Sequence, residues 1–220
     1  MTTQPRLITP GADFYTYIHK SFRVRLFQAA AQAGATDWTD TTEATAMCLT
    51  ATGLFRDLRD HAEHEATFWH PLIARVNADA VRSIETEHAT QDHQLCQLES
   101  LLLAANDGDI DAGREFYRAL NAFLGDFLLH LAEEEQGNPL LWAAYADEDL
   151  GGQLMAFKLS IPLDESLRYL ESMLPALNPQ DRAAIFEDLM HAPEPVVAAV
   201  KALTFRVLGP EAWPGREAVA

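Results

Sequence analysis

The segment HAEHEATFWHP, residues 61–71, decides how the rest of the chain is interpreted. It places three histidines and two glutamates in a stretch whose other residues are compatible with an α-helix. His61 and Glu65 are four residues apart, so a helix brings both side chains to one face, about 6 Å apart along its axis. Such a pair is either a solvated surface pair or two ligands of a metal ion, and the remaining sequence must distinguish the two.

Composition and charge exclude several classes of protein. The chain has 220 residues, 48% of them hydrophobic, which predicts a packed core. Its net charge of −17 argues against binding to nucleic acid or to an anionic membrane surface. No apolar run approaches the roughly 20 residues of a membrane span, and the N-terminus lacks the features of a signal peptide. The two cysteines show no pair spacing, so we expect a cytoplasmic protein.

The sequence pattern predicts an all-α fold. No strand-like alternation persists, and long stretches rich in Ala, Leu, Glu, Gln and Arg are broken by short Gly, Asn, Asp and Pro signals. We expect Pro71 to kink or shorten the second helix and the segment 137–139 to bend the fourth. Residues 1–150 are therefore predicted to form an up-down four-helix bundle, with helices at about 13–33, 40–76, 77–106 and 109–145.

The character of the chain changes after Leu150. Two adjacent glycines at 151–152 and Pro162 interrupt shorter helical pieces, and Asn178 followed by Pro179 is typical of a helix start. We expect residues 151–220 to form a helical extension that packs on the bundle.

Each of the four predicted bundle helices carries one histidine on its apolar stripe. The stripes advance in alternating steps of four and three residues, as helices facing the interior of a bundle do. In two helices a glutamate follows the histidine one turn later. The stripe histidines are His19, His61, His88 and His130, and the glutamates are Glu65 and Glu134.

The two stripe glutamates require a positive partner. None of the four stripes contains Lys or Arg, and a carboxylate buried without a partner either shifts its pKa or finds a cation. Two inward-facing His-x-x-x-Glu units, with one histidine from each other helix, form a dinuclear metal site. Imidazole and carboxylate donors suit iron, manganese or zinc. The predicted ligands are His19, His61, Glu65, His88, His130 and Glu134.

Several neighbouring residues have more than one interpretation. Three further histidines fall off the stripes and are interpreted as surface residues or as residues that orient a ligand: His64, His70 and His93. Glu133 and Glu135 are either solvated or orient a ligand histidine. Asp92, one turn after His88, is a candidate extra ligand. Tyr15, one turn before His19, either packs in the core or donates a hydrogen bond to a metal-bound species.

The sequence resembles the hemerythrin-like, or HHE cation-binding, domain family over residues 10–148. The segments that carry the resemblance are YIHKSFR (17–23), HAEHEATFWHPLI (61–73), ETEHATQDHQL (85–95) and HLAEEEQGNPLLW (130–142). The resemblance implies a non-haem di-iron centre, with two iron ions held by the six predicted ligands and bridged by carboxylates. Oxygen-carrying hemerythrins have a second histidine where this chain has Asp92. Simple oxygen carriage is therefore not expected, and a more open or more oxidisable centre fits better.

Three functions remain open. We favour a protein that binds or senses oxygen, nitric oxide or iron, with a small diatomic ligand or peroxide and an unknown protein as partners. The second is a di-iron oxidoreductase that reduces peroxide, oxygen or nitric oxide, so whether the chain is an enzyme stays open. The third is a structural helical module with zinc or no metal.

Overall fold

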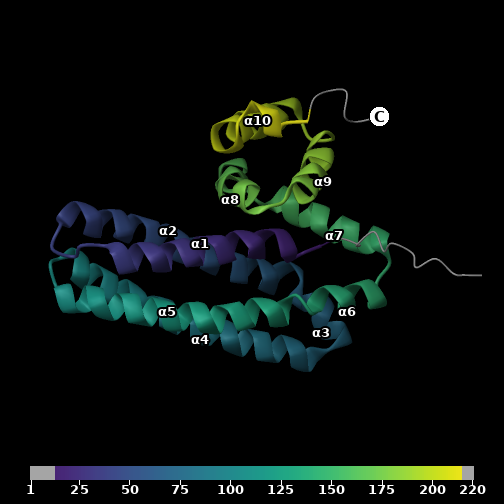
Figure 1. Ribbon diagram of the computed structural model, residues 1–220. Coiled ribbons are helices and arrows are strands. Elements are labelled where there is room, and N and C mark those ends of the chain that lie inside the picture. Colours follow the sequence, from purple (N-terminus) through teal and green to yellow (C-terminus); the bar gives the residue numbers. More distant parts are fainter. Residues whose placement is uncertain (1–12, 215–220) are drawn as a thin grey trace, which may run out of the picture.

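The computed structural model describes residues 13–214, and all regular elements within this range are helices. The all-α prediction is confirmed. Residues 1–12 of the predicted bundle and residues 215–220 of the predicted extension lie outside the described residues. Figure 1 shows four long helices running side by side, in which α1 and α4 each pack on both α2 and α5. This is the predicted up-down bundle, formed by α1 (Thr16–Ala35), α2 (Thr41–Phe68), α4 (Ala78–Asn106) and α5 (Ile110–Glu134).

The starts of three bundle helices are fixed by side chains that accept hydrogen bonds from the first turn. The carboxylate of Asp40 accepts from the backbone N–H groups of Thr42 and Glu43 at 2.7 and 3.3 Å. Asn77 caps α4 and Asp109 caps α5 in the same way. Such caps satisfy N–H groups that have no partner inside the helix, so these starts can be predicted from the sequence to within a few residues.

Two of the predicted long helices are each divided in two. The second ends at Phe68, and α3 (His70–Val76) begins after Trp69. Pro71 causes this break, because it has no N–H and its ring collides with the preceding turn, whereas the first turn of a new helix accepts it. The fourth is likewise divided into α5 and α6 (Gly137–Ala144), and α3 packs on α6 at one end of the bundle.

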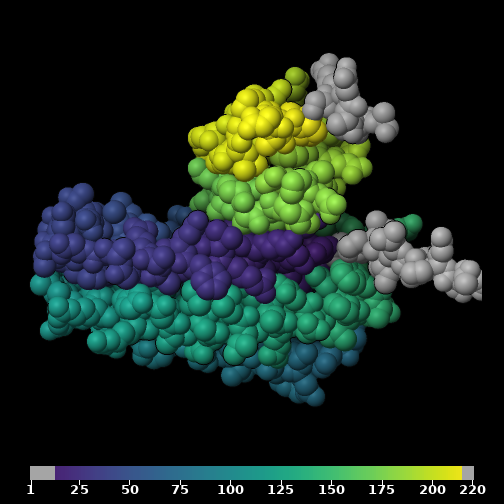
Figure 2. Space-filling model, viewed as in Figure 1, coloured from purple at the N-terminus to yellow at the C-terminus, as the bar shows by residue number. Residues whose placement is uncertain are grey.

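The remaining helices lie on one side of the bundle. They are α7 (Asp147–Ser160), α8 (Leu163–Ala176), α9 (Pro179–Leu189) and α10 (Glu194–Leu208). In Figures 1 and 2, α8 lies over α1, and α7 also contacts α2. Asn178 caps α9 by accepting from Gln180 and Asp181 at 2.9 and 3.0 Å, which confirms the predicted helix start. None of the helices in residues 13–214 has both the length and the apolar character needed to cross a bilayer.

A pair of glycines in α5 tests the packing of the bundle. A Cβ on Gly113 would lie 2.4 Å from Trp38 Cδ2, whereas a Cβ on Gly125 would meet nothing within 4 Å. We expect Gly113→Ala to lower the free energy of unfolding by about 1–3 kcal/mol through overpacking. Gly125→Ala should raise it by up to about 1 kcal/mol, because alanine is the better helix former. Urea unfolding measures both, and equal stability of the two variants would contradict the packing described here.

Candidate metal centre

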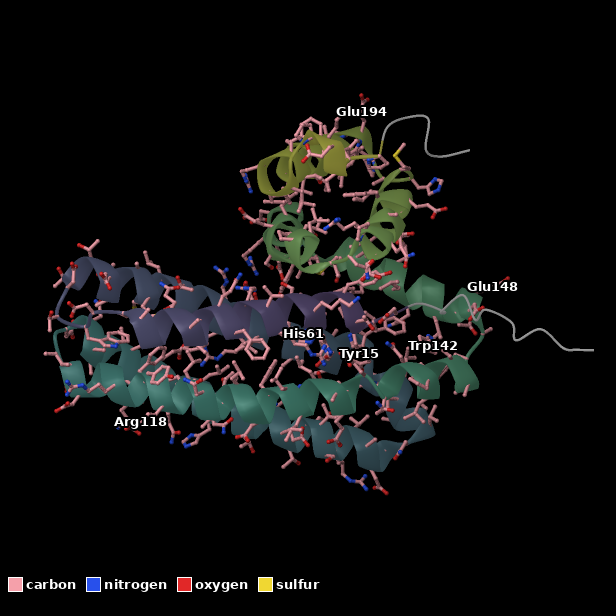
Figure 3. The ribbon with its side chains drawn as sticks, viewed as in Figure 1. Tyr15, His61, Arg118, Trp142, Glu148 and Glu194 are labelled. Atoms are coloured by element: carbon pink, nitrogen blue, oxygen red, sulfur yellow. The ribbon has the colours of Figure 1, made fainter. Side chains whose placement is uncertain are left out.

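The six predicted ligands come together inside the bundle. Both glutamates and three of the histidines are buried, and His88 is the most exposed, with 13% of its side chain accessible. Figure 3 shows His61 and Tyr15, which both lie next to His19, with ring centroids 5.2 and 5.4 Å from its ring. The residues are His19 from α1, His61 and Glu65 from α2, His88 from α4, and His130 and Glu134 from α5. Their assignment as ligands stays a prediction.

The four histidines form two pairs whose nitrogens converge. The Nε2 atoms of His19 and His61 are 3.2 Å apart. The Nε2 atoms of His88 and His130 are 3.1 Å apart. Each pair joins two helices, and a nitrogen–nitrogen distance near 3 Å is suited to two ligands of one ion. The arrangement therefore provides two adjacent positions for a cation, each flanked by two imidazoles.

Each glutamate presents one oxygen to each histidine pair. Glu65 Oε1 lies 3.1 Å from His61 Nε2, and its Oε2 lies 3.4 Å from His88 Nε2. Glu134 Oε2 lies 3.3 Å from His19 Nε2, and its Oε1 lies 2.9 Å from His88 Nε2. A carboxylate whose two oxygens face different histidine pairs is placed to bridge two ions, so the geometry suits a dinuclear site.

The carboxylates are held ionised by histidines alone. Among residues 13–214, no Lys or Arg forms an ion pair with Glu65 or Glu134, and both Glu65 oxygens and Glu134 Oε2 are buried without a hydrogen-bond partner. Burial and the charge of Glu65 raise the pKa of Glu134, but the facing imidazoles of His130, His19 and His88 outweigh them and lower this pKa to about 2. Unpartnered, ionised oxygens that face imidazole nitrogens are what a cation would satisfy, so the residues fit a metal.

The imidazoles respond to the same charges. Burial lowers the pKa of His19, but the neighbouring carboxylates of Glu134, Glu135 and Glu65 outweigh burial and raise the pKa to about 10. His88 is affected in the same way by Glu134 and Glu65, and its pKa rises to about 9. Without a metal, protons on these imidazoles therefore balance the carboxylates. A metal ion would take the place of those protons, since only neutral imidazole is a ligand.

Outer carboxylates orient two of the predicted ligand histidines. His19 Nδ1 lies 3.1 Å from Glu135 Oε1, which also accepts from Arg23 Nη1 at 2.7 Å. His130 Nδ1 lies 2.8 Å from Glu87 Oε2. A carboxylate on Nδ1 fixes the tautomer and turns Nε2 toward the centre. Of the two residues considered for this role, Glu135 therefore contacts a predicted ligand histidine and the exposed Glu133 does not. Glu87 carries no signal in the sequence, because its partner lies on another helix.

Of the two interpretations of His70, a surface residue or a residue that orients a ligand, the structure contradicts the first. Its side chain is 2% exposed, and its ring stacks on His88 with centroids 5.6 Å apart and planes at 18°. Burial lowers the pKa of His70, which favours the neutral imidazole. His64 instead faces Glu165 at 3.6 Å, and His93 is exposed and bonded to Gln97 at 3.0 Å. Only one of the three histidines off the stripes therefore enters the cluster.

Asp92 and Tyr15 lie in opposite kinds of environment. Asp92 is 61% exposed and accepts a hydrogen bond from Arg59 Nε at 2.8 Å, so it lies on the outside of α4 and does not reach the centre. Tyr15 is buried, its ring is 5.4 Å from that of His19, and its hydroxyl has no hydrogen-bond partner among the described residues. Burial, together with Glu65 and Glu134, raises the pKa of Tyr15 well above its usual value, so the phenol remains protonated.

A family model for the hemerythrin HHE cation binding domain matches residues 11–138. The chain belongs to this family. No curated protein and no solved structure matches the chain. The region matched to the HHE domain contains all six predicted ligands and His70, whereas α7 to α10 lie beyond it. Membership of a cation-binding family and a buried cluster of histidines and glutamates agree that this bundle is a metal-binding domain.

Proposed function

We propose that this HHE domain holds two iron ions and binds or senses a diatomic molecule, oxygen or nitric oxide, or iron itself. The observation that carries the proposal is the pair of glutamates, Glu65 and Glu134, each with one oxygen toward each histidine pair. Imidazole and carboxylate donors without a thiolate suit iron, manganese or zinc. Iron is favoured because it can both change valence and bind a diatomic molecule.

The roles of the residues follow from their positions. His19 and His61 would hold one ion and His88 and His130 the other, with the two glutamates between them. When bound, the iron pair supplies open coordination positions and a change of valence. Aromatic rings shield the imidazoles from water: Phe22 lies 5.0 Å from the ring of His61, and Phe127 lies 5.5 Å from that of His130. A dry environment strengthens every electrostatic interaction at the centre.

Tyr15 supplies a hydrogen-bond donor beside one ion position. Its protonated hydroxyl is buried close to His19 and has no acceptor among residues 13–214. It is held there by close packing, because a Cβ on Gly137 would lie 3.2 Å from that hydroxyl. A small ligand bound on the His19 side would provide the missing acceptor.

Metal loading and gas exposure test this proposal. Protein purified without added metal is analysed for its elements, then loaded with ferrous iron without oxygen, and finally exposed to oxygen or nitric oxide. We expect two irons per chain and a new charge-transfer absorption with at least one gas. Absence of iron binding would contradict the proposal, and an unchanged spectrum with both gases would contradict gas binding and leave iron itself as the bound species. A folded, metal-free protein whose stability is unchanged by Glu65→Ala would instead indicate a structural module.

A di-iron oxidoreductase is the second candidate, and Tyr15 is the observation that favours it. Reduction of peroxide, oxygen or nitric oxide consumes protons, and the Tyr15 hydroxyl is a protonated hydrogen-bond donor buried close to His19. Steady turnover above that of free iron, lost in Glu134→Ala and slowed in Tyr15→Phe, would support this candidate over simple binding. Binding without turnover in the wild-type protein would exclude it.

A further inference from the structure

His70 is a buried imidazole with no partner that explains its burial. It is the first residue of α3, its side chain is 2% exposed, and neither ring nitrogen has a hydrogen-bond partner among residues 13–214. Burying polar atoms without partners costs free energy, and such atoms in a native protein call for a missing partner. Because both nitrogens are unsatisfied, a side-chain rotation that exchanges them would leave the deficit unchanged.

The neighbours of His70 indicate that its missing partner is a metal ion. One donor atom each from His70, Glu65 and His88 lie within 4.8 Å of one another. Donor atoms bound to one ion at about 2.1 Å are separated by about 3 to 4.2 Å. The three groups therefore come within about 0.6 Å of a shared coordination sphere, on the side of the centre that His88 occupies.

The other ring nitrogen of His70 also has the surroundings of a ligand histidine. Its Nδ1 lies 4.0 Å from Glu85 Oε1. His19 and His130 each have a carboxylate facing Nδ1, from Glu135 and Glu87. For His19 and His130 this carboxylate leaves Nε2 for the interior, which is the arrangement that orients histidine ligands of metals. His70 has a carboxylate on the same side of its ring at a longer distance.

The helix break at Trp69 makes this position possible. In an unbroken α2, His70 would follow Glu65 by five residues and point about 140° away from it around the helix axis. Pro71 ends α2 early, and the new helix α3 turns its first side chain toward the core. The proline that interrupts the helix thus brings a fifth imidazole to the centre.

We propose that His70 is a ligand, through Nε2, of the ion held by His88 and Glu65. This inference rests on the proposed metal centre, and it gives the two ions different numbers of imidazole ligands. The ion beside His88 and His130 then has three imidazoles, and the ion beside His19 and His61 has two. The ion beside His19 and His61 therefore keeps more open coordination positions, and Tyr15 lies next to His19. An external ligand therefore binds on the His19 side.

Proton NMR of the protein loaded with Co²⁺ alone tests this assignment. Each imidazole bound through Nε2 keeps one exchangeable Nδ1 proton, which a paramagnetic ion shifts far outside the normal range. We expect five such resonances in the wild-type protein and four in His70→Leu. Competition titration should show at least about a tenfold loss of Co²⁺ affinity at one site in that variant, because even changes around a ligand cost about 10- to 100-fold.

His64→Leu is the matched control, since His64 lies six residues earlier and outside the cluster. It should retain five resonances and the wild-type affinity. Four shifted resonances in the wild-type protein would overturn the assignment of His70 while leaving the dinuclear centre intact. No shifted resonance at all would overturn both. The count in the wild-type protein decides the question even if His70→Leu does not fold.

Discussion

Replacement of Glu134 by glutamine is expected to reduce the bound metal from two ions per chain to one at most. Glu134 faces both histidine pairs, with Oε2 3.3 Å from His19 Nε2 and Oε1 2.7 Å from His130 Nε2. Glutamine has nearly the same shape, but it brings no charge and only one acceptor oxygen. It can therefore neither bridge two cations nor neutralise them. We expect the affinity for the second ion to fall by more than about 100-fold, since loss of an outer partner alone costs about 10- to 100-fold.

Glu65→Gln should have the same effect, because Glu65 also has one oxygen on each side. Glu133→Gln is the control, as it removes the same charge from the adjacent, exposed position of α5. Elemental analysis after dialysis against a weak chelator, together with circular dichroism to verify folding, makes the comparison. Two ions retained by both Glu65→Gln and Glu134→Gln would show that these carboxylates are not the bridge.

Most of the centre could be predicted from the sequence because its signals are local. A histidine and a glutamate four residues apart on an apolar stripe must share a helix face, and a stripe that faces the core must bury them. This reasoning found the residues that the structure brings together at the centre, such as His61 with Glu65 and His130 with Glu134. In any helix of sufficient length, the spacing of the apolar residues predicts which face is buried.

The remaining residues depend on features that the period does not contain. The sequence leaves His70 open between the surface and the centre, because the direction of its side chain is set by the helix break at Trp69. Glu87 was missed because its contact with His130 depends on how far α4 and α5 are shifted along each other. Helix breaks and the relative shift of neighbouring helices arise from tertiary packing, so they become visible only in the folded structure.

Replacement of Asp57 by alanine is expected to destabilise the protein by about 2 kcal/mol and to loosen α8 from the bundle. The Asp57 side chain on α2 is 3% exposed, and it accepts hydrogen bonds from Arg25 of α1 at 2.7 Å and from Arg168 of α8 at 2.9 Å. Loss of one partner from a fully buried ion pair costs about 3–5 kcal/mol. The side chains of Arg25 and Arg168 are 20% and 29% exposed, so water compensates part of this cost.

Glu171→Ala is the control for this prediction. Glu171 pairs with Arg206 at 2.9 Å, but both side chains are more than half exposed, and such a surface pair contributes about 0–1 kcal/mol. Urea unfolding should therefore separate the two variants clearly. Amide hydrogen exchange shows where the structure is loosened, because amides of α8 should exchange faster in Asp57→Ala while those of α5 keep their protection. Equal stability of the two variants would contradict a structural role for Asp57.

The position of Asp57 gives this prediction a consequence for the centre. It lies one turn before His61 on α2, and Arg168 also donates to Asp60, the residue directly before that histidine, at 2.7 Å. The helix that holds His61 and Glu65 is thus tied to α8 by charged hydrogen bonds next to the proposed metal ligands. If α8 is loosened in Asp57→Ala, metal affinity measured in the same variant will show whether the contact with α8 also holds α2 in the geometry that the metal requires.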